Sequence, residues 1–260
     1  EIERAISRKA AVLALTHANY RTSEVFDMAR LNRAARKHGV FTVWDLSHSA
    51  GAMPVNLNGT KADFAVGCGY KYLNGGPGGP GYLFIAKRHQ KKVAPALPGW
   101  MGHARPFDFS GRFIPARGIQ SQLTGTPYVY GLVALDAALD AFQGVDFKAL
   151  YAKAGLLGDI FLVLALTGGA KFGLRPACPL ERVRRGSQVT LRHPQGYAVM
   201  QALIASGVVG DFRPPDILRF GMTPLYTSYE DVFRAAGRLV DILAARTYRT
   251  RRWQARKRVT

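Results

Sequence analysis

Acidic residues are scarce in this 260-residue sequence, which has 17 Asp and Glu against 36 Lys and Arg and a formal net charge of +19. The basic residues are densest in Arg246–Arg258, which holds seven of them and no acid, and in a second cluster at Arg182, Arg184 and Arg185. Such a charge favours anionic ligands and can serve nucleic-acid binding. No zinc finger, clear helix-turn-helix or aromatic-interleaved RNA motif accompanies it, so nucleic acid is an unlikely partner on this sequence.

Cysteine is also rare, because only Cys68 and Cys178 are present. Two cysteines cannot form a disulfide framework, and nothing resembles a secretory signal, so a reducing, cytoplasmic setting is expected. The longest apolar run, Ile160–Leu166, is too short to cross a bilayer, and no membrane partner is expected. No metal site is predicted.

Nucleotide-binding loops are missing as well. The sequence has no Gly-x-x-x-x-Gly-Lys-Ser/Thr segment. Gly76-x-Gly78-x-x-Gly81 matches a dinucleotide fingerprint on paper, but that motif must open a helix. Here Tyr82–Ala86 follows, which is typical of a strand. Both nucleotide interpretations therefore fail.

What the sequence does contain is an unusual lysine turn at Cys68–Gly81. Lys71 follows an apolar run and meets five glycines and two prolines within the next ten residues. Glycine permits close backbone approach and positive φ, and proline stiffens the path, so such a turn would hold the lysine amine in one place. A surface lysine before a flexible loop is the alternative interpretation.

The composition, with 48% hydrophobic and 20% charged residues, is that of a globular chain with a sizeable core. The chain begins at Glu1 and soon enters Ala10–Leu15, the pattern of a fully buried strand. We therefore expect it to be the later part of a longer protein. We predict two domains: residues 1–145 as the C-terminal part of a large domain, and 146–260 as a small α+β domain with a basic tail.

The order of elements predicts an α/β fold. Strands are expected at 11–16, 40–44, 62–67 and 81–86, with a helix at about 24–38 that Ser23 caps and Gly39 ends. Apolar strands joined by a helix favour a mostly parallel sheet covered on both faces. After an irregular, functional or interfacial segment at Trp100–Thr126, the expected elements are helices 127–142 and 146–166, strand 187–193, helix 195–206, strand 217–222 and helix 229–245.

Polar side chains stand at the ends of the predicted strands. Ligands of such sheets collect beyond the carboxyl ends of the strands, and Thr16, Asp45 and Lys71 each lie at or just after one. A lysine that forms a Schiff base needs a partly desolvated amine and an electron-sink cofactor. Pyridoxal phosphate is such a sink when a carboxylate keeps its ring nitrogen protonated. Asp45, 26 residues before Lys71 on an adjacent strand, has the spacing for this role, although alone it is more typical of a turn residue or N-cap.

Two longer motifs carry a family resemblance. Asp45-x-x-His48-Ser49-Ala50-Gly51, together with Gly67–Gly78, resembles the kynureninases, which are fold-type I pyridoxal-phosphate enzymes. The resemblance continues through Pro98–His103, Gly125–Pro127 and Arg219–Tyr226, and so covers nearly the whole chain. Cysteine desulfurases carry His where Tyr70 stands and need a nucleophilic cysteine, for which Cys178 is a weak candidate.

The resemblance implies a role for each matching residue. Lys71 matches the Schiff-base lysine that also shuttles protons, and Asp45 the carboxylate paired with the pyridine nitrogen. Tyr70 matches a phosphate-contacting tyrosine that also acts as a general acid. Arg219 matches the arginine that clamps the substrate α-carboxylate. Four further cofactor contacts are implied: His48 and Thr16 near the phenolic oxygen, and Trp100 and Thr126 reaching the cofactor phosphate of the neighbouring subunit, so that a homodimer with shared sites is expected.

Each assignment has a simpler structural alternative. His48 alone is more typical of a satisfied polar contact. Trp100 fits packing within its loop, and Thr126 fits an N-cap before Pro127. Arg219 fits a surface ion pair with Asp216 or Asp231.

The implied reaction is the hydrolysis of L-kynurenine, or 3-hydroxykynurenine, to an anthranilate and L-alanine in tryptophan catabolism and NAD biosynthesis. The sequence does not choose between the two substrates. The family's chain is longer at its N-terminus, where it carries the aromatic residue that stacks on the cofactor, so we expect a chain starting at Glu1 to retain the cofactor poorly and to have little activity. The alternatives are another fold-type I enzyme, such as a cysteine desulfurase or aminotransferase, and an inactive basic binding module.

Overall fold

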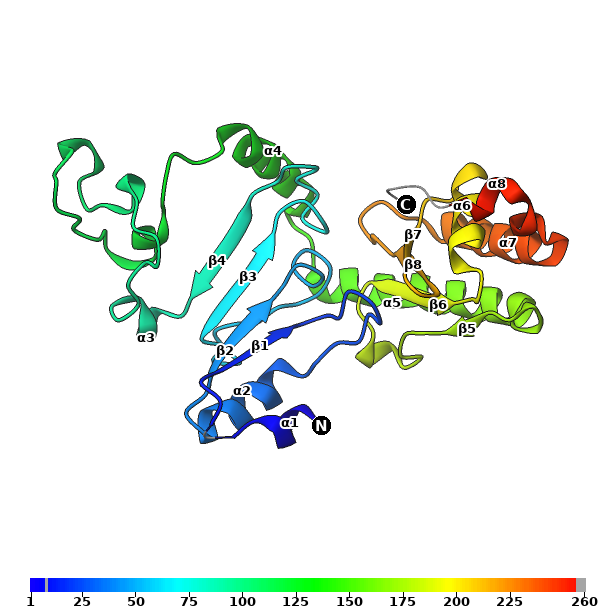
Figure 1. Ribbon diagram of the computed structural model, residues 1–260, viewed down its shortest axis with the longest axis horizontal. Helices are drawn as coiled ribbons and strands as arrows, with labels where there is room; N and C mark the ends of the chain where they lie inside the picture. Colours follow the sequence, from blue (N-terminus) through cyan, green and yellow to red (C-terminus); the bar gives the residue numbers. More distant parts are fainter. Residues whose placement is uncertain (8, 256–260) are drawn as a thin grey trace. The chain divides into compact units, whose positions relative to one another are not determined.

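The computed structural model describes residues 1–7 and 9–255, and the chain divides into two compact units (Figure 1). Unit 1 comprises Glu1–His17, Asp27–Ser47 and Val55–Gln143. Unit 2 comprises Ala18–Phe26, His48–Pro54 and Gly144–Thr260, so two short segments of the N-terminal half belong to it. The division into domains at 1–145 and 146–260 stays a prediction. Part of the predicted basic tail, Arg256–Arg258, lies outside the described residues.

Unit 1 is built on a four-stranded sheet in the order β1-β2-β3-β4, with bounds Val12–Thr16, Phe41–Asp45, Phe64–Cys68 and Gly81–Ile85. β1, β2 and β3 run parallel, and β4 pairs antiparallel with β3. The helices of this unit are α1 (Ile2–Ala5), α2 (Met28–Lys37), α3 (Lys87–Gln90) and α4 (Val129–Leu139). The predicted α/β class with a mostly parallel sheet is confirmed.

Helix α2 is shorter than predicted at its N-terminal end. Its N-cap is Asp27, whose carboxylate accepts the backbone N–H of Arg30 at 2.9 Å. Ser23 is buried and has φ +61°, a left-handed conformation that begins no helix, so the prediction of Ser23 as the cap was wrong. At the other end the helix stops before Gly39, which has φ +72° as a residue after a helix C-terminus often does.

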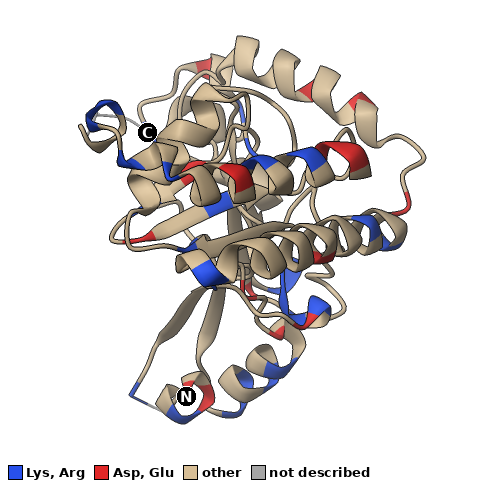
Figure 2. Ribbon diagram, turned by 90° about the vertical axis from the view of Figure 1, so that its right-hand side faces the viewer, with Lys and Arg blue, Asp and Glu red and all other residues tan. Residues whose placement is uncertain are grey.

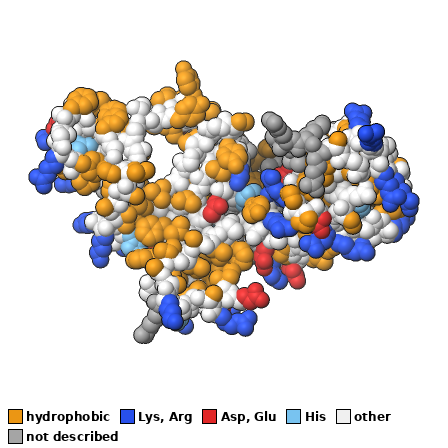
Figure 3. All heavy atoms as spheres, viewed as in Figure 1, with side chains coloured by type: hydrophobic (Ala, Val, Ile, Leu, Met, Phe, Trp, Pro, Cys, Tyr) orange, Lys and Arg blue, Asp and Glu red, His pale blue; other side chains and the backbone are white. Residues whose placement is uncertain are grey.

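One face of the sheet is covered and the other is open. On the covered face, the indole N–H of Trp44 donates to the Asn32 side chain of α2 at 2.8 Å, and both residues are buried. The strand register places Val12, Phe41 and Val66 together on the opposite face, where they are 51, 46 and 39% exposed. Hydrophobic side chains accordingly gather over this sheet in Figure 3. The expectation that helices cover both faces is wrong for the residues described.

A buried carboxylate ties the amino end of the sheet together. Asp63 accepts the backbone N–H and hydroxyl of Thr42 at 2.9 and 3.0 Å, and it also contacts Arg88 at 2.6 Å and His89 at 2.7 Å. The His89 ring stacks on Phe64. Burial raises the pKa of Asp63, but the hydrogen bonds from His89, Thr42 and Arg88 outweigh it and leave that pKa below its usual value.

We expect Asp63→Asn to destabilise unit 1 by about 2–4 kcal/mol, because an amide nitrogen would face groups that donate hydrogen bonds. The pKa of Asp63 is lower in the folded protein than in the unfolded chain. The ionised carboxylate therefore contributes its full stabilisation above the unfolded pKa of about 3.9, and this stabilisation is lost as the pH falls through the folded pKa. Urea unfolding at neutral and acidic pH measures both effects. Asp108→Asn, which removes an exposed ion pair with Arg105, is the matched control and should change stability by less than about 0.5 kcal/mol.

Unit 2 contains an antiparallel sheet in the order β5-β6-β8-β7, with bounds Arg175–Pro176, Gln188–Arg192, Ile217–Gly221 and Asp211–Arg213. Its helices are α5 (Phe147–Gly169), α6 (Gly196–Ala205), α7 (Tyr229–Ala245) and α8 (Arg251–Gln254). Side chains of α5, α6 and α7 pack with residues of the sheet to form its core, which includes Leu157, Phe161, Leu191, Leu203, Leu218 and Leu243. The predicted smaller α+β domain is confirmed as a fold class.

Helix α5 and the turn that follows it, Phe147–Phe172, are long and apolar enough to cross a membrane by length and composition. The run Ile160–Leu166 is thus part of a longer apolar helix than the sequence indicated. Within unit 2 this helix packs against α7, and Leu157, Phe161 and Ala165 are buried. These residues make α5 a core helix of unit 2.

The predicted cluster Arg182, Arg184 and Arg185 is largely neutralised by acids of the same unit. Arg182 and Arg185 both bind Asp159, and Arg184 pairs with Glu24 at 2.6 Å. The buried Arg185 also donates to the backbone carbonyl of Leu180 at 3.0 Å. Lys and Arg of several elements alternate with acidic residues in Figure 2. The cluster therefore stabilises the fold, whereas an anion-binding surface would need these charges unpaired.

Candidate active site

The carboxyl ends of β1 and β2 place Thr16 and Asp45 side by side. Thr16 is the register partner of Asp45, and Asp45 is the register partner of Val66 in β3. Register partners in parallel strands project to the same face of a sheet, so the hydroxyl and the carboxylate share the open face. The predicted proximity of these two residues follows directly from the strand pairing.

The backbone around Asp45 fixes its side chain. One carboxylate oxygen accepts the N–H of Ser47 at 2.8 Å, and the Asp45 carbonyl accepts the N–H of His17 at 2.9 Å. A carboxylate has about four acceptor positions, so one such bond leaves room for a protonated ring nitrogen. The half-buried position at a strand end therefore fits the predicted pairing with a pyridine.

Lys71 lies three residues after β3, in a turn held by its own backbone. Gly69 donates to the Pro80 carbonyl at 2.8 Å, and Gly75 donates back to the Gly69 carbonyl at 2.9 Å. Asn74 donates to the Lys71 carbonyl at 2.9 Å, with φ +62°. These bonds fix the Lys71 backbone beside the end of the strand that neighbours Asp45. A rigid lysine turn is what the glycine and proline pattern predicted.

Tyr70 and Lys71 contact each other. The Lys71 ammonium lies 5.5 Å from the centroid of the Tyr70 ring, within cation–π range. Tyr70 is 49% exposed, whereas Lys71 is half-buried. The Tyr70 side chain is therefore open to a ligand, and Lys71 is partly shielded from solvent.

The turn leaves no room for a side chain at Gly75. A Cβ there would lie 2.8 Å from the Gly69 carbonyl oxygen. We expect Gly75→Ala to break the Gly75–Gly69 bond and displace Lys71, lowering activity by about 10²-fold. Gly237→Ala, in helix α7 of unit 2, whose Cβ would meet nothing within 4 Å, is the matched control. Equal activity of the two variants in a turnover assay would contradict a rigid lysine turn.

Tyr82 is a neighbour of the site that the sequence interpretation missed. It is the register partner of Gly67, and a Cβ on Gly67 would lie 2.2 Å from its hydroxyl, so the phenol lies over the glycine. Burial first, and then electrostatic interactions with Cys68 and Asp45, raise the pKa of Tyr82 to about 12. Tyr82 is thus neutral at physiological pH. A glycine opposite an aromatic residue on the next strand is the signal that would have revealed it.

Trp100 and Thr126 lie on the irregular segment of unit 1, away from regular strands. The Trp100 ring packs edge-on against Phe107 at 5.7 Å, and both rings are exposed. Thr126 is exposed, and α4 begins at Val129 with Tyr128 as its N-cap, so Thr126 is not the helix cap that the alternative interpretation suggested.

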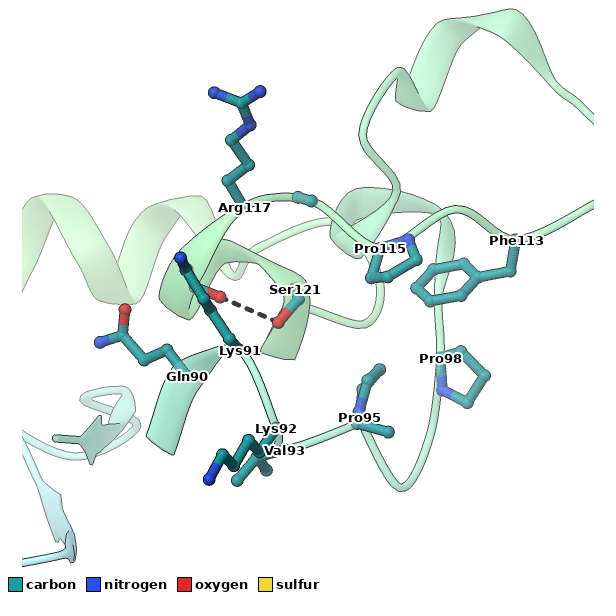
Figure 4. Close-up of a pocket in the computed structure, with 13 residues that line it drawn as sticks. Gln90, Lys91, Lys92, Val93, Pro95, Pro98, Phe113, Pro115, Arg117 and Ser121 are labelled. Carbon is teal, nitrogen blue, oxygen red and sulfur yellow. Dashed lines mark hydrogen bonds between the residues drawn. The ribbon is translucent and has the colours of Figure 1, made fainter. Parts of the chain in front are cut away.

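Residues 113–121 of the same segment and residues 90–98 line an open pocket of about 830 Å³ that contains none of the predicted site residues. Lys91, Lys92 and Arg117 stand at its rim, while Phe113 and Pro115 form an apolar wall (Figure 4). The hydroxyl of Ser121 donates to the Gly118 carbonyl at 2.9 Å within it. The cavity is therefore a feature separate from the lysine turn.

The other two predicted residues belong to unit 2. His48 is half-buried in the segment His48–Pro54, which Ser187 holds by donating to the Ala52 carbonyl at 3.0 Å. Arg219 is buried in β8 and pairs with Asp211, so the suggested partners Asp216 and Asp231 were wrong. Unit 1 thus places Thr16 beside Asp45 at the ends of β1 and β2 and places Tyr70 and Lys71 just after β3, and unit 2 carries His48 and Arg219.

Two protein-family profiles match the chain. The sequence profile described as "Aminotransferase class-V" matches residues 1–163 of this chain. This chain belongs to the class-V aminotransferase family. A second profile, described as "Kynureninase C-terminal domain", matches residues 150–239 of the chain.

Curated relatives of this family member carry the name kynureninase. One from Deinococcus radiodurans is 50% identical over 232 residues, which are 89% of this chain and 57% of the relative. One from Burkholderia mallei is 45% identical over 256 residues, which are 98% of this chain and 62% of the relative. The chain therefore spans about three-fifths of the length of these relatives.

Several solved structures have the same fold as this chain. An apo cysteine desulfurase from Thermococcus onnurineus NA1 aligns with a TM-score of 0.77 and 20% identity, over 94% of this chain and 62% of its own. An aspartate aminotransferase from Thermus thermophilus aligns with a TM-score of 0.69 and 20% identity, over 94% and 68%. At such identity the likeness shows the fold alone, that of the fold-type I pyridoxal-phosphate enzymes.

Proposed function

We propose that the protein is a kynureninase, which uses pyridoxal phosphate to hydrolyse the Cβ–Cγ bond of L-kynurenine or 3-hydroxykynurenine. The observations that carry the proposal are that Asp45 is fixed at the end of β2 and that Lys71 is fixed just beyond the neighbouring strand β3. The identity of 45–50% to kynureninases over most of the chain supports this substrate class. Tyr70, where cysteine desulfurases have His, favours it further.

Pyridoxal phosphate, when bound, supplies an aldehyde for the substrate amine and a ring that withdraws electrons from the substrate. Asp45 would keep a proton on the ring nitrogen. Lys71 would take the α-proton from the substrate and later return a proton, as a general base and acid. Tyr70 would hold the cofactor phosphate and give a proton at the γ-carbonyl or at Cβ. Thr16 and His48 would contact the cofactor near its phenolic oxygen.

The reaction balances with one water. The elements of water add across the bond between Cβ and the γ-carbonyl carbon: hydroxide joins the carbonyl carbon, and a proton joins Cβ. The products are anthranilate, or 3-hydroxyanthranilate, and L-alanine. Arg219 would bind the α-carboxylate of the amino acid throughout, which a planar guanidinium does better than a lysine.

The proposal includes a homodimer in which Trp100 and Thr126 reach the cofactor phosphate of the partner subunit. The exposed apolar surface of this region supports a covering partner, since Trp100, Phe107 and Phe109 are 41, 73 and 80% exposed. Apolar patches of this kind mark interaction surfaces. Mixing an inactive Lys71→Ala variant with an inactive Trp100→Ala variant should restore part of the activity in mixed dimers. Two variants that stay inactive when mixed would contradict shared sites.

Substrate comparison tests the proposed function. The protein, expressed from its complete coding sequence and loaded with pyridoxal phosphate, should release anthranilate and alanine from L-kynurenine and no sulfide from L-cysteine. Measuring 3-hydroxykynurenine in parallel assigns the preferred substrate. Turnover of cysteine, or transamination without aryl release, would instead favour a cysteine desulfurase or an aminotransferase.

A further inference from the structure

Arg219 is held by a second residue of unit 2. Arg219 in β8 and Asp211 in β7 are register partners in an antiparallel pair. The Arg219 Nε donates to one Asp211 oxygen at 2.6 Å, and its Nη2 donates to the other, so the two groups meet side-on through two bonds. Its Nη1 donates to the Tyr20 carbonyl at 2.7 Å. The Arg219 side chain is 9% exposed.

The Arg219 guanidinium has more N–H donors than Asp211 and Tyr20 use. A guanidinium has five N–H donors, one on Nε and two on each terminal nitrogen. The three bonds to Asp211 and Tyr20 use one donor on each nitrogen. Within residues 1–7 and 9–255, one N–H therefore remains on Nη1 and one on Nη2. This pair matches the two oxygens of a carboxylate.

Asp211 also offsets the cost of burying the charge. A guanidinium in a buried position is unfavourable unless it is paired, and a long side chain loses little entropy on binding when it is already fixed. Arg213 contacts the same Asp211 carboxylate at 3.4 Å but is itself 43% exposed. The Asp211 carboxylate thus holds the buried Arg219 directly, with Arg213 as a more exposed neighbour.

We propose that Asp211 is a positioning residue that orients the Arg219 guanidinium, so that its two remaining terminal N–H groups form a site for the α-carboxylate of an amino-acid substrate. This inference rests on the proposed function, because it takes Arg219 as the carboxylate-binding group. The site selects α-amino acids over amines that lack the carboxylate. Asp211 itself contacts no reacting atom.

The test compares substrates with and without the carboxylate. In the cofactor-loaded protein, Asp211→Asn should raise the KM for L-kynurenine about 10- to 100-fold with a smaller change in kcat. The KM for the corresponding amine, which has no α-carboxylate, should not change. Asp211→Glu should restore part of the affinity. Asp216→Asn, in the same hairpin, is the matched control and should behave as the wild type.

If Asp211→Asn raised the KM for L-kynurenine and for the amine by the same factor, the inference would be overturned, because a purely structural role of Asp211 gives that result. An unchanged KM for L-kynurenine in Asp211→Asn would overturn it as well. Should the wild type not cleave kynurenine, the proposed function fails, and calorimetric titration with L-alanine and ethylamine decides about Asp211 separately. Weaker binding of L-alanine alone in Asp211→Asn would uphold the inference. No binding of L-alanine to the wild type, or equal effects on both ligands, would overturn it.

Discussion

Replacing Lys71 with alanine is expected to lower kynurenine turnover by about 10³-fold or more, because the substitution removes both the amine that binds the cofactor and the base that moves the α-proton. The turn itself should persist, since its bonds are made by the backbone of Gly69, Asn74 and Gly75. Steady-state turnover and circular dichroism of the same preparation separate lost chemistry from lost folding.

Two further variants sharpen this result. Lys71→Arg keeps the positive charge but offers no amine for a Schiff base, so it should be as inactive as Lys71→Ala. Lys87→Ala removes an exposed lysine at the start of α3 and should leave turnover unchanged. Substantial activity in Lys71→Arg would show that the charge suffices, and the proposed role of the amine would then be wrong.

Replacing Asp45 with alanine is expected to lower turnover by about 10²- to 10³-fold, because a fixed charge that stabilises a developing charge contributes about this much. Without the carboxylate, the ring nitrogen would lose its proton and withdraw electrons less strongly. Asp45→Asn should have a similar effect, since an amide can hydrogen-bond the nitrogen without the negative charge that keeps it protonated.

The Asp45 variants should also change cofactor affinity, measured by equilibrium dialysis with pyridoxal phosphate. Asp241→Asn, an exposed carboxylate on α7, is the control and should match the wild type in both assays. An Asp45→Asn variant with wild-type turnover would contradict the proposed pairing with the ring nitrogen. A folding defect in this conservative variant is unexpected, because the Asp45 carbonyl still accepts the His17 N–H and an amide oxygen can still accept the Ser47 N–H.

The parts of this site that follow from local pattern were predictable. The apolar strands ending at Thr16 and Asp45 set the register, and parallel register brings these two side chains to one face. The glycines and prolines after Lys71 predicted a fixed turn, which the backbone bonds of Gly69 and Gly75 form. In each case the determining contacts lie within a few residues or between regularly paired strands.

The contacts that depend on irregular tertiary structure were not predictable. Asp211 meets Arg219 only because the three-residue β7 pairs with β8, and Pro214-Pro215 directly after β7 are unfavourable for a strand. Ser23 resembles a helix cap in sequence, yet its left-handed backbone and burial in unit 2 exclude that role.

Borohydride reduction of the cofactor-loaded protein tests the central claim most directly. Hydride fixes the bond between pyridoxal phosphate and the amine that holds it, and peptide mapping by mass spectrometry then identifies the lysine. We predict a single modified residue, Lys71, and loss of the label in Lys71→Ala and, in part, in Asp45→Ala. A label on another lysine, or an unmodified Lys71 in protein that has bound the cofactor, would contradict the account.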